Sequence, residues 1–313
     1  MNAARWWIYQ RERFPLLAHG PLVLVFSASA VCYSALLRAR DENWSRPDTI
    51  AFVVAFVVCL LFFLELRIAD EFKDREADAT YRPYRPVPRG LVTLRELAVL
   101  GVGLGLVQFA LAAWLAPALV LVLLLAWIYF ALMSREFFVR EWIKGRHFTY
   151  LWTHMLVMPI VDLFATACDW ITRTAPDGTL LPPRGLGWFL AASYFNGIVI
   201  EIGRKIRSAD AEEVGVATYT AVWGRPKAVA LWLGAAALTA SCAMLAAREI
   251  GWTTGFAPVA LALLAMIVIA AVRFLRQPTT RRGKAVELAS GLWTLGLYLG
   301  IGVVPALVRE LRA

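Results

Sequence analysis

Three aspartates recur at a four-residue spacing where a long apolar stretch ends: Asp70, Asp74 and Asp78. On an α-helix, a step of four residues turns the side chain by only about 40° and raises it by about 6 Å, so the three carboxylates would share one face. Like charges at this spacing repel each other. Mg²⁺ in proteins is held by one or two carboxylates together with waters and substrate phosphates. The spacing therefore predicts a magnesium site, and the alternative is a solvated helix end whose acids pair with neighbouring basic residues.

A stiff segment that carries arginines follows the aspartates within a few residues. Pro83, Pro86 and Pro88 forbid a regular helix there, and Arg82 and Arg85 directly precede two of these prolines. A guanidinium group can grip a phosphate with two parallel hydrogen bonds. Carboxylates that hold a metal, followed by a rigid loop that binds phosphate, are suited to binding a diphosphate at a membrane surface.

The run from Asp70 to Gly90 resembles the first signature of the UbiA superfamily of intramembrane prenyltransferases, which includes membrane terpene cyclases. The family pattern is N-D-x-x-D-x-x-x-D followed by N-R-P-x-P-S-G, and here the aspartates precede Arg85-Pro86-x-Pro88-x-Gly90. Asp70 replaces the usual Asn and Glu71 the usual adjacent Asp, and both changes keep an oxygen ligand available. The resemblance is tight over this segment and loose over the rest of the chain. It implies Mg²⁺ as the cofactor and an isoprenyl diphosphate as the substrate.

A second charged segment lies between residues 201 and 224. Gly215, Thr218 and Gly224 resemble the tail of the family's second signature, which in the family accompanies a second ladder of aspartates. Here Lys205 and Ser208 lie near the positions where acids are expected, so the ladder is broken. The acidic groups that remain in this segment are Glu201, Asp210, Glu212 and Glu213.

Two arrangements could serve the diphosphate at this second segment. Either the remaining acids rebuild a metal site in a shifted register, with Glu201 as a ligand, or the neighbouring cations contact the diphosphate directly. We favour the second arrangement, with Arg204, Lys205 and Arg207, because a fixed cation can supply part of the electrostatic stabilisation that a metal ion gives. A charged helix end without a role in chemistry is the third alternative.

The resemblance also implies roles for individual residues. Catalytic roles fall to the metal-binding Asp70, Asp74 and Asp78 and to Lys205, and Glu201 is expected as a further metal ligand. Arg82, Arg85, Arg204 and Asn196 are expected to bind substrate. Tyr129 and Tyr194 are further candidates because they lie deeper in the spans, and core packing is the alternative for each of them.

Two further ionisable residues, His154 and Asp162, fall inside apolar stretches, where such groups are usually functional or paired. Each is a candidate pocket residue, and core packing or helix pairing is the alternative. His147 lies seven residues before His154 on the same helix face, but two histidines without a third ligand do not define a metal site.

The elements that must position these residues are membrane helices. The chain is 60% hydrophobic with a mean hydropathy of +0.62, whereas soluble domains are roughly 45–50% apolar. Apolar stretches of the length that crosses a bilayer recur along the sequence. We therefore predict an all-α polytopic membrane bundle that forms a single membrane domain over residues 1–313, with active-site loops at about 67–91 and 203–226. The nine expected spans are roughly 14–37, 49–66, 92–115, 117–134, 148–168, 185–203, 226–247, 255–275 and 285–308.

The distribution of basic residues predicts the orientation of the bundle. With the N-terminus in the cytoplasm, 24 of the 32 Lys and Arg fall in cytoplasmic segments and 8 fall on the other side, as the positive-inside rule requires. Both active-site loops are then cytoplasmic, in the plasma (inner) membrane. The net charge of +9 follows this alternating pattern, so it does not indicate a nucleic-acid partner. The four cysteines have no spacing typical of a zinc site or a disulfide framework.

The sequence therefore predicts a Mg²⁺-dependent intramembrane prenyltransferase. It would ionise an isoprenyl diphosphate and transfer the prenyl group to an aromatic or lipid acceptor, with membrane lipids around it. The alternative is a membrane terpene cyclase, in which the substrate's own double bonds attack the cation. A transporter or lipid-binding relative without catalysis is the third, less favoured prediction.

Overall fold

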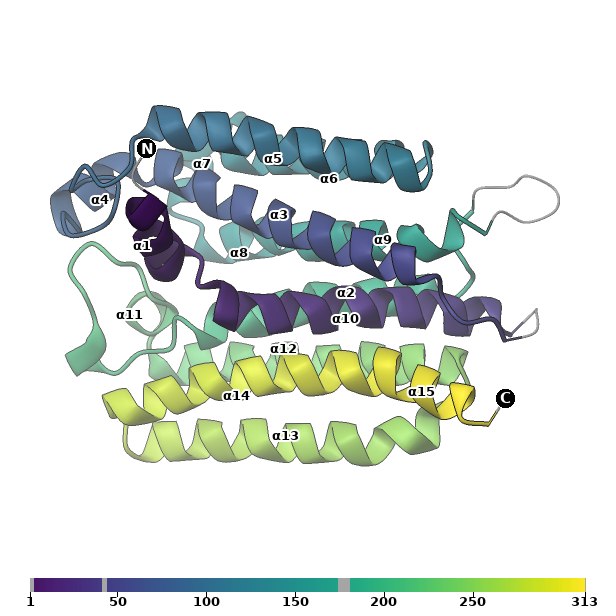
Figure 1. Cartoon of the computed structure of the whole chain (residues 1–313). Helices are drawn as coiled ribbons and strands as arrows, with labels where there is room; N and C mark the ends of the chain where they lie inside the picture. The colour runs from purple at the N-terminus through teal and green to yellow at the C-terminus, as the bar shows by residue number, and fades with distance from the viewer. Residues whose placement is uncertain (1–2, 41–43, 174–180, 313) are drawn as a thin grey trace.

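The computed structural model describes residues 3–40, 44–173 and 181–312, and every regular element in these residues is helical (Figure 1). The prediction of an all-α bundle is confirmed. The long helices are α2 (Leu16–Arg38), α3 (Thr49–Lys73), α5 (Leu94–Leu115), α6 (Leu119–Ser134), α9 (Val157–Trp170), α10 (Leu186–Gly203), α12 (Arg225–Glu249), α13 (Thr253–Arg276) and α14 (Thr280–Tyr298). The shorter elements are α1 (Ala3–Arg13), α4 (Arg75–Tyr81), η1 (Glu136–Phe138), α7 (Arg140–Lys144), α8 (His147–Met155), η2 (Ala209–Ala211), α11 (Tyr219–Trp223), the π-helical η3 (Leu299–Val303) and α15 (Val304–Glu310).

Eight helices in the described residues are long and apolar enough to cross a membrane, when α8 and α9 are counted as one and α14 is joined to α15. They correspond to eight of the nine expected spans. The ninth, expected at 117–134, is α6, an apolar helix of 16 residues that rises only about 24 Å. It runs back along α5 (Figure 1). The first and last described residues lie at opposite ends of the bundle (Figure 1). The chain is an integral membrane protein with several spans.

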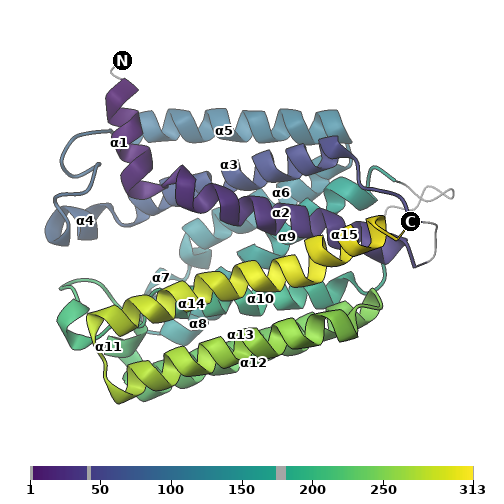
Figure 2. The same cartoon turned by 60° about the horizontal axis from the view of Figure 1, so that its bottom comes forward.

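The helices form three groups that pack on one another. Helices α12, α13 and α14 contact each other in sequence, and α12 packs on α10. Helices α2, α3, α9 and α10 lie in the middle, and α5 and α6 flank α3 on the other side (Figures 1 and 2). The middle group therefore lies between the other two and provides most of the cavity described below.

Helices α3 and α5, which lie before and after the first active-site loop, each begin with a side-chain cap. Asp48 caps α3 by accepting a hydrogen bond from the Ile50 backbone N–H at 2.9 Å. Thr93 and Glu96 form a capping box at the start of α5, in which each side chain accepts from the other residue's backbone N–H. Such caps satisfy backbone donors that the first helical turn leaves free. The capping box thus fixes the point at which the loop after α4 enters α5.

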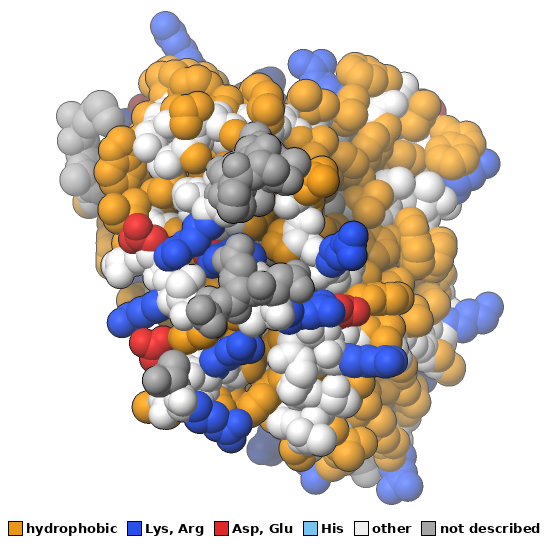
Figure 3. All heavy atoms as spheres, turned by 90° about the vertical axis from the view of Figure 1, so that its right-hand side faces the viewer, with side chains coloured by type: hydrophobic (Ala, Val, Ile, Leu, Met, Phe, Trp, Pro, Cys, Tyr) orange, Lys and Arg blue, Asp and Glu red, His pale blue; other side chains and the backbone are white. Residues whose placement is uncertain are grey.

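One end of the bundle carries α1, α4 and α11, and we call it the site end. There α1 runs across the direction of the long helices (Figure 2), and Arg13 pairs with the buried Glu71 near the end of α3. At the opposite end, Lys and Arg side chains gather over the middle of the face, with hydrophobic side chains around them (Figure 3). Beneath that face, Arg38 donates two hydrogen bonds, of 2.9 and 2.8 Å, to the buried Asp169 carboxylate. This pair joins α2 to α9.

A close helix contact fixes the site end of α10. A Cβ atom on Gly203 would lie 2.0 Å from Ser290 Oγ of α14 and 3.1 Å from Trp232 Nε1 of α12. Only glycine permits this approach of three helices. The charged residues that follow Gly203 are therefore held against α12 and α14.

Candidate active site

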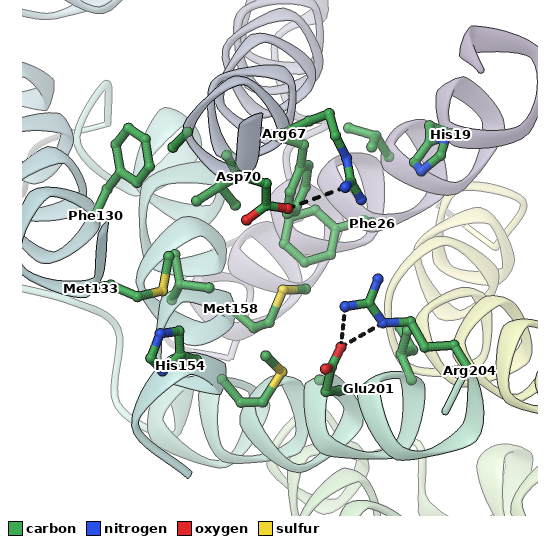
Figure 4. A pocket seen from close by; sticks show the side chains of 18 of the residues that line it. His19, Phe26, Arg67, Asp70, Phe130, Met133, His154, Met158, Glu201 and Arg204 are labelled. Carbon is green, nitrogen blue, oxygen red and sulfur yellow. Dashed lines mark hydrogen bonds and ion pairs between the residues drawn. The ribbon is translucent and has the colours of Figure 1, made fainter. Parts of the chain in front are cut away.

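A cavity of about 340 Å³ opens at the site end, between the middle helices and α6, α8 and α14. Its walls are mainly apolar, with aromatic rings and thioethers close to one another (Figure 4). Charged side chains line it near the ends of α3 and α10. The apolar lining includes Phe26, Phe63, Phe130, Met133, Met155, Met158 and Tyr298.

The two charged segments predicted from the sequence meet at this cavity. Arg67 and Asp70 of α3 form one wall, with Arg67 Nη1 3.2 Å from Asp70 Oδ2. Glu201 and Arg204 form the facing wall, and Arg204 Nε donates to Glu201 Oε2 at 2.6 Å (Figure 4). Residues more than a hundred positions apart in the sequence thus place two arginines and two carboxylates around one opening.

Lys205 lies beside these two pairs, and its side chain contacts Glu201 and the Tyr219 ring. Its Nζ atom is 2.9 Å from Glu201 Oε1 and 5.5 Å from the centre of the Tyr219 ring. Glu201 is 6% exposed and pairs with both Arg204 and Lys205. The two cations together outweigh the single buried carboxylate, so this wall of the cavity carries a net positive charge.

Asp74 is located at the junction between α3 and α4. The four-residue periodicity continues through the junction, because the backbone N–H of Asp74 donates to Asp70 O at 2.9 Å and that of Asp78 donates to Asp74 O at 2.8 Å. Within the described part of the chain, no side chain forms a hydrogen bond or ion pair with the Asp74 carboxylate. Partial burial, and then the charges of Asp70 and Asp78, raise the pKa of Asp74 above its usual value. A carboxylate with this surplus of negative charge is where a cation would bind.

Asp78 differs from the other two aspartates because arginines already neutralise it. It is 2% exposed, with Arg82 Nε 3.1 Å from Oδ1 and Arg85 Nη1 2.7 Å from Oδ2. The segment after Arg82 consists of turns, as its prolines predicted, and Gly90 adopts a φ of +76° that suits glycine. In this arrangement Arg82 and Arg85 hold the loop to α4 instead of facing the cavity.

Three of the predicted substrate-binding residues hold neighbouring helices together. Tyr129 donates to Thr153 O at 2.6 Å, and Tyr194 donates to Trp152 O at 3.0 Å. Asn196 accepts from Thr294 Oγ1 at 3.1 Å. None of these three side chains is among the described residues that line the cavity.

Several cavity residues were not anticipated from the motifs. Lys73 lines the cavity, with Nζ 2.9 Å from Tyr150 Oη and 3.0 Å from Glu136 Oε1. These groups come from α3, α8 and η1, so no sequence motif links them. His154 does line the cavity. Asp162 instead accepts a hydrogen bond from Tyr298 at 2.7 Å, which pairs α9 with α14.

The fold and the cavity define a class of intramembrane protein that can bind a molecule with an anionic head and an apolar tail. Residues 24–295 match the sequence profile of the UbiA prenyltransferase family, and the chain belongs to that family. It is therefore a UbiA-family prenyltransferase, and the family implies an isoprenyl diphosphate substrate.

Solved structures support the fold. One, described as a UbiA homolog from Aeropyrum pernix K1, has a TM-score of 0.66 at 14% identity and covers 94% of this chain and 98% of its own. Another, from work on digeranylgeranylglyceryl phosphate synthase in membranes, has a TM-score of 0.59 at 13% identity and covers 91% of this chain and 98% of its own. A comparison with curated protein sequences found no match.

Proposed function

We propose that this protein ionises an isoprenyl diphosphate with the help of Mg²⁺ and transfers the prenyl group to an aromatic or lipid acceptor. One observation carries the proposal: the Arg67–Asp70 and Glu201–Arg204 pairs face each other at the charged end of a cavity whose other walls are mainly apolar (Figure 4). A diphosphate fits the charged end and an isoprenoid tail fits the apolar walls.

The residues present fit a magnesium ion at the end of α3. Asp70 is half exposed and has one oxygen free of Arg67, and Asp74 has a raised pKa that a cation would lower again. We propose these two carboxylates as the ligands. When bound, Mg²⁺ would neutralise charge on the diphosphate oxygens. Asp78 and Glu201 would become ligands only by exchanging their present arginine partners for the metal.

Cations of the protein supply the rest of the electrostatic stabilisation. Arg67, Lys73 and Arg204 line the cavity and are positioned to hold the diphosphate as its charge increases on leaving the allylic carbon. Lys205 would keep Glu201 oriented and add positive charge from behind. We propose Arg82 and Arg85 as supports of the loop, because both are bound to Asp78.

The apolar part of the cavity would protect the allylic cation. Phe26, Phe63 and Phe130 offer ring faces and edges to the tail, and aromatic faces stabilise nearby cations. Apolar walls also exclude water, so the cation is captured by the intended acceptor and not hydrolysed.

We propose that the site end faces the cytoplasm and that the chain acts as one membrane domain. The loops at this end hold most of the basic residues, which the positive-inside rule assigns to the cytoplasmic side. An Arg89→Cys variant in intact cells should stay unlabelled by an impermeant maleimide, whereas Arg173→Cys should react. The reverse labelling would contradict this orientation.

The test of the function is to incubate the purified protein in lipid with geranyl, farnesyl and geranylgeranyl diphosphates and Mg²⁺. Each reaction is run with no acceptor, with a hydroxybenzoate and with a glyceryl phosphate lipid, and diphosphate release and the organic product are measured. Release that depends on an acceptor supports prenyl transfer. Release without acceptor, with a cyclic hydrocarbon product, would assign the terpene cyclase reaction instead. Because the family is one of transferases, the transporter alternative is not retained.

A further inference from the structure

His154 has an unpartnered nitrogen in the wall of the cavity. The side chain is 6% exposed, lies on the last turn of α8 and lines the cavity (Figure 4). Its Nδ1 atom is 2.9 Å from Tyr150 O, and its Nε2 atom is buried without a hydrogen-bond partner among the described residues. A buried polar atom without a partner is uncommon in proteins and calls for an explanation.

The hydrogen bonds around the ring fix its tautomer. A backbone carbonyl can only accept, so Nδ1 must carry the hydrogen that binds Tyr150 O. Thr153 Oγ1, 3.4 Å from Nδ1, already uses its own hydrogen for the carbonyl groups of Thr149 and Tyr150. Nε2 of the neutral ring therefore holds a lone pair, and no described group of the protein donates to it.

Charged groups from neighbouring elements lie around the His154 ring. Lys73 of α3 binds Tyr150 Oη at 2.9 Å, and the Tyr150 ring stacks on the imidazole with centroids 3.7 Å apart. The Lys73 ammonium group therefore lies beyond the stacked ring, and its described partners are Tyr150 and Glu136 rather than the imidazole. The acids nearest from other elements, Glu136 of η1 and Glu201 of α10, are each paired with lysine or arginine.

Other polar groups in the cavity are engaged with partners in the protein. Asp70 and Glu201 are paired with arginines. Tyr298 donates its hydrogen to Asp162, deep in the bundle. His19 lines the cavity too, with Nδ1 3.1 Å from Pro15 O, but its side chain is only half-buried, whereas Nε2 of His154 is buried. Among the described cavity residues, His154 thus offers a buried lone pair close to the charged end.

We propose that His154 Nε2 is the general base that takes up the proton lost during prenyl transfer; this inference rests on the proposed function. In the reaction, the allylic C–O bond breaks and both of its electrons leave with the diphosphate. An electron pair of the acceptor forms the new bond to the allylic carbon. The hydrogen displaced from the acceptor leaves as a proton and binds Nε2, from which it passes to water after product release. No oxidant or further reactant is needed.

The test compares His154→Asn with wild type in the lipid-reconstituted protein. The asparagine amide can still donate to Tyr150 O, but it has no basic nitrogen at the position of Nε2. Product formation from the isoprenyl diphosphate and acceptor that wild type uses should fall by about 10²–10⁴-fold, the range typical of a general base. Binding of the same isoprenyl diphosphate should be unchanged. His147→Asn, seven residues earlier on α8 and outside the cavity lining, is the matched control and should keep its activity.

Chemical rescue separates a base from a structural residue. For His154→Ala, added imidazole should restore part of the turnover in proportion to its unprotonated fraction as pH is varied. The inference would be overturned if the activity of His154→Asn were within threefold of wild type. It would also be overturned if imidazole failed to restore turnover of His154→Ala at any pH. Either result would leave the proposed function in place. If wild type itself releases no diphosphate from any substrate, the proposed function fails, and this inference fails with it.

Discussion

Arg85 Nη1 lies 2.7 Å from Asp78 Oδ2, and the carboxylate that it binds is almost completely buried. This contact closes the proline-rich loop back onto α4. It also separates the three regularly spaced aspartates into two groups, because Asp70 and Asp74 remain available to a cation while Asp78 is already neutralised.

Asp78→Ala should destabilise the protein, since it leaves two arginines without their buried partner. Hydrogen bonds to charged groups contribute about 1.5–3 kcal/mol, so a loss of about 2 kcal/mol is expected. Thermal unfolding in detergent measures it. In a double-mutant cycle, Arg85→Ala should cost little more once Asp78 is already alanine. Fully additive effects of the two substitutions would show that the pair is not coupled.

Asp74→Asn should instead stabilise the metal-free protein at neutral pH. The pKa of Asp74 is raised by burial and by neighbouring carboxylates, so the folded state binds its proton more tightly than the unfolded state does. Its ionised form therefore costs stability, and this cost disappears as pH falls through the raised pKa. The melting temperature of the variant should exceed that of wild type at pH 7, and the difference should vanish in acid. Glu76→Gln, at an exposed acid on α4, should show no such difference.

Asp74→Ala should abolish turnover while membrane insertion stays intact. The substitution removes a carboxylate that we assign to the metal and breaks no hydrogen bond or ion pair with a described side chain. Diphosphate release, and Mg²⁺-dependent stabilisation against heat, should both be lost. Wild-type activity in this variant would refute the metal role of the aspartate.

Arg204→Gln should weaken binding of the isoprenyl diphosphate more than Arg207→Gln. Arg204 lines the cavity, whereas Arg207 is bound to Glu213 in the loop outside it. Losing a charge-assisted hydrogen bond to phosphate of about 1.5–3 kcal/mol raises KM by roughly ten- to a hundredfold. Steady-state kinetics at saturating Mg²⁺ measure both variants. If the two variants had equal KM values, the diphosphate would have to bind away from Arg204.

Much of the fold and part of the site followed from the sequence because they depend on local patterns. Apolar stretch length predicted the helices, and the four-residue spacing of Asp70 and Asp74 placed both at the end of α3. For the second charged segment we favoured cations over a rebuilt metal site, and Arg204 of that segment lines the cavity. These features require only the periodicity of a helix and the preference of charges for its ends.

Other parts of the site depend on contacts between distant segments. Nothing local indicates that Arg85 turns back to Asp78, since that depends on the path of a loop with three prolines. Likewise, Lys73, Glu136 and Tyr150 meet only because α3, η1 and α8 converge. Tyr194 was expected in the cavity because of its depth along a span, but it binds the Trp152 carbonyl group instead. Depth along a span does not define which side of the helix faces the cavity.

Gly203→Ala should destabilise the protein and lower its activity together. The new methyl group would lie 2.0 Å from Ser290 Oγ and 2.9 Å from Ser290 Cβ, so α10 and α14 must move apart. Ser290 cannot simply rotate away, because its hydroxyl accepts from Trp232 Nε1 at 3.0 Å and donates to Val286 O at 3.0 Å. Overpacking of this kind typically costs about 1–3 kcal/mol.

Since Arg204 directly follows Gly203, the same movement should shift its guanidinium from the diphosphate and raise KM. Gly291→Ala, one residue beyond Ser290 on α14, has no atom within 4 Å of the added carbon and should be neutral in melting temperature and kinetics. Adding Ser290→Gly to Gly203→Ala removes both clashing atoms. The double variant should therefore reverse part of the increase in KM, even though the Trp232 hydrogen bond is gone. A Gly203→Ala variant that melts and turns over like wild type would show that the three helices are not held in contact at this point, and the position assigned to Arg204 would lose its structural basis.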